Sequence, residues 1–159
     1  MDLNKLTLSD KIIAGSGIVL FIAYFLTWFT VDAGIFSADV SGGDVTNAFL
    51  FATIPMLIGL VMAGVVIASK LFDVKLPELP VPWGTAMFGA GALAALLVVM
   101  KLLLGEDDEG IDGIEINRGL GLFLATLAAL GLAAGGFLKF SGKDGDAGSP
   151  PPPPGAAPF

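Results

Sequence analysis

The residues best suited to chemistry in this chain are carboxylates, and six of the fifteen are gathered in one short segment. Residues 106–115 contain six of them: Glu106, Asp107, Asp108, Glu109, Asp112 and Glu115. Oxygen-rich loops of this kind can bind Ca²⁺, but no register of the segment reproduces the acid and glycine spacing of an EF-hand loop. We therefore expect a solvated acidic loop without a metal, and the alternative is a docking patch for a basic partner.

The remaining composition argues against an enzyme. The 159 residues include no cysteine and no histidine, which removes thiol chemistry, the commonest metal ligand and the usual acid–base side chain. The apolar runs contain no pair of carboxylates, and no phosphate-binding glycine loop is present. We predict a non-catalytic protein without a cofactor. Because eight basic residues face fifteen acidic ones, we expect no nucleic-acid partner.

The elements that must position the acidic segment are membrane helices. The chain is 55% hydrophobic and only 14% charged, and it contains four long apolar runs: residues 12–30, 48–69, 82–104 and 119–138. At about 1.5 Å of rise per residue, each run can cross the roughly 30 Å hydrocarbon core of a bilayer. The sequence predicts an all-α membrane protein, with an antiparallel bundle of four transmembrane helices in residues 1–140. Residues 141–159, which are rich in proline and glycine, are predicted to be a disordered tail.

Individual residues refine this picture of the spans. The first run exceeds the usual length of a signal-peptide core, so we expect it to remain uncleaved. Pro55 should kink the second span because it cannot donate its backbone N–H. Trp28 and Trp83 are expected at opposite membrane interfaces, and Lys101 is expected to extend its ammonium to the headgroups. No other charged side chain lies within the runs, and none lies at mid-depth, which disfavours a proton-coupled transporter or a voltage sensor.

Small residues recur along the spans and predict close helix packing. The clearest set is in the fourth span and consists of Ala125, Ala129, Gly131, Ala133 and Gly135. Small residues four positions apart let helix backbones approach each other in lipid. This face can hold the protein's own bundle together, or it can bind a partner or a second copy.

The distribution of lysine and arginine predicts the orientation. The N-terminus, the connection at residues 70–81 and the tail carry six basic residues, whereas the two other loops flank only Lys101 and Arg118. By the positive-inside rule, both termini are cytoplasmic. Acidic residues balance the basic ones on the cytoplasmic side, so the whole net charge of −7 is expected on the outer face.

Several stretches together resemble a known group of proteins. They are Leu8-Ser9-Asp10-Lys11, Phe25-Leu26-Thr27-Trp28-Phe29, residues 76–84 (LPELPVPWG) and residues 118–125 (RGLGLFLA). This combination resembles small four-span integral membrane proteins of high-GC bacteria, in which the first span often ends in Leu-Pro-Trp; Thr27 replaces that proline here. The group has no assigned activity, so the resemblance implies only topology and location in the bacterial cytoplasmic membrane. A claudin-like protein is disfavoured because claudins carry a cysteine pair in their first outer loop.

Three functional hypotheses remain open. The first is a non-catalytic accessory or scaffold subunit that acts through helix–helix contacts and an acidic outer face, with the lipid bilayer and other membrane proteins, or a second copy, as partners. The second is an oligomeric pore or facilitator for ions or small solutes. The third is recruitment of a cytoplasmic partner by the polyproline segment of the tail, which consists of Pro150, Pro151, Pro152, Pro153 and Pro154.

Overall fold

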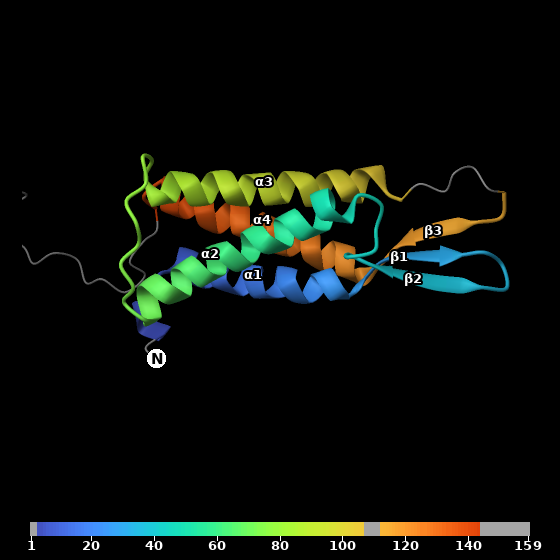
Figure 1. The fold of residues 1–159 in the computed structure, drawn as a ribbon, viewed down its shortest axis with the longest axis horizontal. Helices are drawn as coiled ribbons and strands as arrows, with labels where there is room; N and C mark the ends of the chain where they lie inside the picture. Colours follow the sequence, from blue (N-terminus) through green and yellow to red (C-terminus); the bar gives the residue numbers. More distant parts are fainter. Residues whose placement is uncertain (1–2, 107–111, 144–159) are drawn as a thin grey trace, which may run out of the picture.

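The computed structural model describes residues 3–106 and 112–143. Within these ranges a short 3-10 turn, η1 (Leu3–Lys5), precedes four α-helices and three strands. The helices are α1 (Leu8–Phe25), α2 (Ile54–Leu71), α3 (Trp83–Leu104) and α4 (Leu120–Phe140), and the strands are β1 (Thr27–Asp32), β2 (Ser37–Ser41) and β3 (Glu115–Arg118). The helices run side by side, and the strands project from one end of the bundle, which we call the sheet end (Figure 1). The start of α1 and the α2–α3 connection lie at the opposite end, which we call the terminal end.

The four helices of the described ranges are each long and apolar enough to cross a membrane, as the sequence predicts. Their outward surfaces are apolar as well. Val61, Leu96 and Leu127 are 64%, 57% and 67% exposed, respectively. A water-soluble helix would carry polar side chains on that face. The exterior of the bundle is therefore suited to lipid.

Glycine and alanine bring the helices into close contact. A Cβ atom built on Gly91 of α3 would lie only 2.6 Å from the backbone carbonyl oxygen of Leu132 in α4. Gly17 of α1 likewise lies against the backbone of Gly59 in α2. Such approaches exclude larger side chains, and they give dispersion contacts in lipid, where helices gain no hydrophobic driving force for association.

The first span differs from the sequence prediction at its outer limit. Helix α1 ends at Phe25, not at residue 30, and Leu26 adopts an extended backbone that leads into β1. Residues 27–30 are aromatic and β-branched, which suits a strand as well as an apolar helix. The prediction of an all-α fold was therefore wrong, because the described chain also contains a three-stranded sheet in the order β2-β1-β3.

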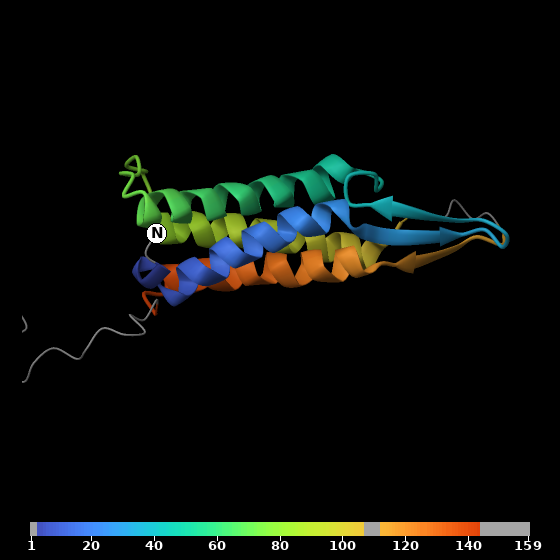
Figure 2. The ribbon, with the colours of Figure 1, turned by 90° about the horizontal axis from the view of Figure 1, so that it is seen from below.

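Figure 2 shows β1 between the other two strands, which extend past the end of the bundle. Both pairings are antiparallel: Thr30 is opposite Asp39 of β2 and Asn117 of β3. The sheet thus joins the two segments that were predicted as loops, residues 31–47 and 105–117. Because these segments lie far apart in the sequence, the sheet ties the end of α1 to the start of α4.

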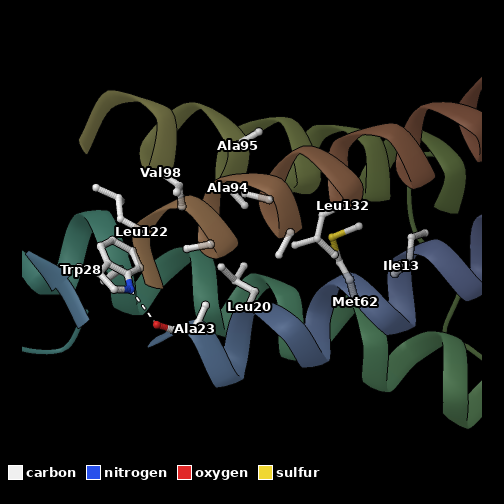
Figure 3. Close-up of a cluster of buried hydrophobic side chains, with 14 of the residues drawn as sticks. Ile13, Leu20, Ala23, Trp28, Met62, Ala94, Ala95, Val98, Leu122 and Leu132 are labelled. Atoms are coloured by element: carbon white, nitrogen blue, oxygen red, sulfur yellow. Dashed lines mark hydrogen bonds between the residues drawn. The ribbon is translucent and has the colours of Figure 1, made fainter. Parts of the chain in front are cut away.

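Trp28 was predicted to lie at a membrane interface, but it lies in the core. It is 1% exposed, and its indole Nε1 donates a hydrogen bond to the Ala23 carbonyl oxygen at 2.8 Å (Figure 3). A Cβ atom on Gly42 would clash with the indole ring, so this glycine leaves space for it. Trp28 therefore seals the bundle beneath the sheet, and the prediction of two lipid-facing tryptophans was wrong for this residue.

The second span begins with a π-helical segment, η2 (Phe49–Thr53), which ends two residues before Pro55. The backbone N–H of Ile54 donates to the carbonyl oxygen of Phe49, five residues earlier. Proline cannot continue an α-helical ladder from the preceding turn. The helix therefore departs from α geometry just before Pro55, and the kink expected at this residue stays a prediction.

Candidate functional site

The sheet has one polar and one apolar face. Side chains alternate along a strand, and residues opposite each other share a face. Thr30 and Asp32 of β1 therefore lie on the same face as their partners, which are Asn117, Asp39, Ser37 and Glu115. The other face carries mainly apolar side chains: Phe29, Val31, Ala38, Val40 and Ile116, together with Arg118. At the base of the sheet this face packs on the core through Phe29, Val40 and Ile116.

The polar face is acidic. Asp39 accepts a hydrogen bond from the Thr30 hydroxyl at 3.0 Å. Asp32 and Glu115 are directly opposite each other in β1 and β3, and like charges in that arrangement destabilise a sheet. The sequence places only two basic residues, Lys101 and Arg118, near this end of the bundle. Their positions therefore decide whether the negative charge is neutralised.

Lys101 is held at the base of the sheet, inside the protein. Its side chain is 5% exposed, and its ammonium lies 2.7 Å from Oε2 of Glu106 and 3.1 Å from the carbonyl oxygen of Thr46. The Thr46 N–H donates to Oε1 of Glu106 at 2.6 Å. The rings of Phe29 and Phe51 lie 5.6 and 5.8 Å from the ammonium, respectively. The expectation that Lys101 extends its ammonium to the headgroups was therefore wrong. We call the group formed by Lys101, Glu106 and Thr46 the clasp.

The environment of Glu106 favours its charged form. Burial of the carboxyl opposes ionisation, but hydrogen bonds from Lys101 and Thr46, together with the charge of Lys101, outweigh it. The pKa of Glu106 therefore lies below its ordinary value of 4.5. Arg118 is also engaged at the base of the sheet, because its Nε donates to the Leu102 carbonyl oxygen at 2.7 Å. Neither cation reaches the far part of the sheet.

The structure separates the six carboxylates of the predicted acidic loop. Glu106 belongs to the clasp and is 11% exposed, so it is not part of a solvated patch. Glu115 lies on the polar face of the sheet, and Asp112 lies in the turn before β3. Asp107, Asp108 and Glu109 lie outside the described residues. Within the described ranges no group of carboxylates is arranged to hold a metal ion.

The predicted packing face of α4 is used inside the bundle. Ala125 and Ala129 are fully buried. Gly131 lies against Ser16 of α1, and Gly135 lies against Ile13 of the same helix. Ala133 packs at the margin of the same core. This face therefore holds α4 against its own neighbours. Pro150–Pro154 of the predicted tail site lie outside the described residues.

A second buried ion pair, which the sequence did not reveal, lies at the terminal end. Asp10 in the first turn of α1 is fully buried, and its Oδ1 lies 2.5 Å from the ammonium of Lys139 at the end of α4. Lys70 of α2 approaches the other carboxylate oxygen at 3.9 Å. Asp10 and Thr7 also form a reciprocal capping box at the start of α1. A capping box is visible in the sequence, but the convergence of three helix ends on Asp10 is not.

Comparison with known proteins adds no identity: no protein-family model, no curated protein and no solved structure matches the chain. The fold and surface define a class only, a four-helix bundle with a lipid-compatible exterior and a small sheet at one end. Its function has to be inferred from the geometry.

Proposed function

We propose that this chain is a non-catalytic integral membrane protein, an accessory or scaffold subunit that presents its sheet to a partner protein on the aqueous side. One observation carries the proposal. The polar face of the sheet carries Asp32, Asp39 and Glu115, while Lys101 and Arg118, the two basic residues at this end of the bundle, are engaged at its base. A stiff acidic surface on an anchored bundle is suited to binding a basic partner.

The absence of chemistry in the sequence supports a non-catalytic role. Histidine and cysteine are missing. The most buried ionisable side chains of the described ranges, Asp10 and Lys101, are held in ion pairs at the two ends of the bundle. Removing one partner of such a pair strongly destabilises the fold, because the other charge stays buried. The two pairs are therefore suited to fixing the helix ends.

Contacts with other helices would use the surface between α2 and α3. An apolar groove of about 270 Å³ lies there, lined by Ile54, Leu57, Ile58, Val61, Met62 and Ala90. The small residues of α4 already pack against α1 and α3. The groove is therefore the better candidate for a helix–helix contact with another membrane protein.

The proposed location is the bacterial cytoplasmic membrane, with both termini in the cytoplasm and the sheet outside. The asymmetry of lysine and arginine supports this orientation. Because the chain has no native cysteine, single cysteines can test it. A cysteine at Ser37 in β2 should react with an impermeant maleimide added to intact cells, and a cysteine at Lys75 in the α2–α3 connection should react only after permeabilisation. Reversed labelling would overturn the orientation.

Cross-linking in native membranes tests the accessory role. A photoreactive residue at Asp39 should give one defined adduct with another protein, and a photoreactive residue at Leu127 on the exposed surface of α4 should give mainly lipid adducts. If the full chain yields only uncross-linked monomer from every position on the sheet, the accessory function is wrong.

A further inference from the structure

Among the described residues, the outer edge of β2 has no partner strand. In the order β2-β1-β3, β2 pairs there with β1 alone. The Ala33 N–H donates to the Phe36 carbonyl oxygen at 2.8 Å, which closes the hairpin and fixes the alternation of the ladder. In an antiparallel pair, every second residue turns its N–H and C=O away from its partner strand. The outward groups of β2 thus belong to Ser37, Asp39 and Ser41.

Part of this edge is already used within the chain. The Ser41 carbonyl oxygen accepts a hydrogen bond from the Asp44 N–H at 3.0 Å. This contact agrees with the assignment above, because the Ser41 carbonyl is one of the groups that point away from β1. The backbone groups of Ser37 and Asp39 form the remaining open part of the edge, and they can receive a short extended segment.

We propose that this edge binds an extended segment of a partner protein in which basic and apolar residues alternate, adding it to the sheet as a further strand. The inference rests on the proposed accessory function and specifies the partner's chemistry. A residue placed opposite Asp39 would share the acidic face with Asp39 and Asp32. Its two neighbours would fall on the face of Ala38 and Val40. A lysine or arginine opposite Asp39, flanked by apolar residues, therefore complements both faces.

A second copy of the chain does not fit this edge. Asp39 is the middle residue of β2. If two β2 strands paired antiparallel along their whole length, Asp39 would lie opposite Asp39 of the other copy. Directly opposed like charges destabilise a strand pair, and the net charge of −7 assigned to this side of the bundle would add repulsion. Charge complementarity thus favours a basic segment from a different protein.

The tip of the β1–β2 hairpin extends the same surface. Ile35 and Phe36 are 88% and 74% exposed, and Phe36 directly precedes β2. Two large apolar side chains in this position offer contact area at one end of the added strand. The tip also lies at the end of the sheet that is far from the helix bundle (Figures 1 and 2).

The test uses the full chain in phosphatidylcholine nanodiscs, whose uncharged surface does not attract cations. The probe is a fluorescent heptapeptide of alternating lysine and valine, and fluorescence polarisation measures its binding. Two further peptides serve as references: one has the same composition with the lysines grouped, and one has glutamate in place of lysine. We expect the alternating basic peptide to bind at least tenfold more tightly than either reference, and more weakly as salt is raised.

Three variants locate the binding. Asp39→Asn removes the attracting charge and should weaken binding about two- to fivefold. Ser37→Pro removes an outward N–H while leaving the ladder to β1 intact, and it should also weaken binding. Asp112→Asn is the matched control, because it changes the charge at the same end away from the edge, and we expect less than a twofold effect. Unchanged fluorescence of the buried Trp28, read in a Trp83→Phe background, will show that each variant is folded.

Two results would overturn the inference. One is equal binding of the alternating and the grouped basic peptides, which would mean that charge alone is recognised. The other is equal weakening by Asp39→Asn and Asp112→Asn. In both cases a defined cross-linked complex in native membranes would leave the accessory function standing. If the alternating basic peptide binds more tightly than both references but the chain is strictly monomeric in native membranes, the accessory function is refuted instead.

Discussion

Replacing Glu106 by glutamine tests whether the clasp stabilises the sheet end. The substitution keeps the size of the side chain and its capacity to accept from the Thr46 N–H, but it leaves the ammonium of Lys101 without a counter-charge. Lys101 is only 4% exposed. Removing one partner of a buried pair typically costs about 3–5 kcal/mol, because the other charge stays buried. The Thr46 carbonyl and the two nearby rings still solvate the ammonium, so we expect about 2–4 kcal/mol of lost unfolding free energy.

The cost should be conditional on Lys101. In the double variant Lys101→Met with Glu106→Gln, no charge is left buried, and the unfolding free energy should return to within about 1–2 kcal/mol of the native value. Titration with sodium dodecyl sulfate in mixed micelles measures this. Trp28 fluorescence reports the unfolding in a Trp83→Phe background. Glu78→Gln in the α2–α3 connection is the matched control and should change stability by less than about 0.5 kcal/mol.

The same clasp predicts a direction for the dependence on pH. The pKa of Glu106 is lower in the folded protein than its ordinary value of 4.5, so the unfolded chain binds the proton more readily. The stabilisation by the clasp is therefore complete above pH 4.5 and is lost as the pH falls through the lower folded-state pKa. In the Glu106→Gln variant this contribution should vanish. Strictly additive losses in the two single variants and the double variant would refute the coupling.

Three further substitutions test the terminal end and the packing, and the same detergent titration measures each. Asp10→Asn keeps a helix-capping side chain but removes the charge that faces Lys139, and we expect a loss of about 2–4 kcal/mol; a loss below about 0.5 kcal/mol would contradict the buried pair. Gly91→Ala forces a methyl group against the backbone of α4 and should cost about 1–3 kcal/mol. Gly89→Ala, its control in the same helix, meets nothing within 4 Å and should be neutral or stabilising by up to about 1 kcal/mol. Trp28→Phe removes one of the two donors to the Ala23 carbonyl and part of a fully buried ring, and it should cost about 1–3 kcal/mol; circular dichroism follows this titration because the variant lacks the Trp28 fluorophore.

The helices were predictable where the sequence marks their ends. Helix α3 begins directly after Pro82 and ends before Gly105, whose positive φ of 76° favours glycine, and the predicted limits 82–104 differ by one residue. The end of α1 was missed because Leu26, Trp28 and Phe29 continue the apolar run without a stop signal. A short aromatic and β-branched run suits either state, and only pairing with distant strands decides between them.

The candidate site depended on contacts that no local pattern contains. The sequence pattern places Asp39 and Glu115 in separate loops and puts residues 27–30 of the intervening strand β1 at the end of a helix. Their common face therefore depends on a pairing between segments more than 70 residues apart. Lys101 was correctly identified as the exceptional charge of the spans. Its partner Glu106 is nearby in the sequence, but Thr46, which completes the clasp, arrives from another loop.

The order of the strands has a consequence for synthesis of the protein. The central strand β1 emerges early, with β2 directly after it, whereas β3 follows only after α2 and α3. At about 5–20 residues per second, the roughly 70 residues between β2 and β3 take on the order of 4–15 s. During that interval β1 has one unprotected edge, and the clasp lacks Lys101 and Glu106. The free edge of β1 in the nascent chain can therefore pair with a wrong strand until β3 has been synthesised.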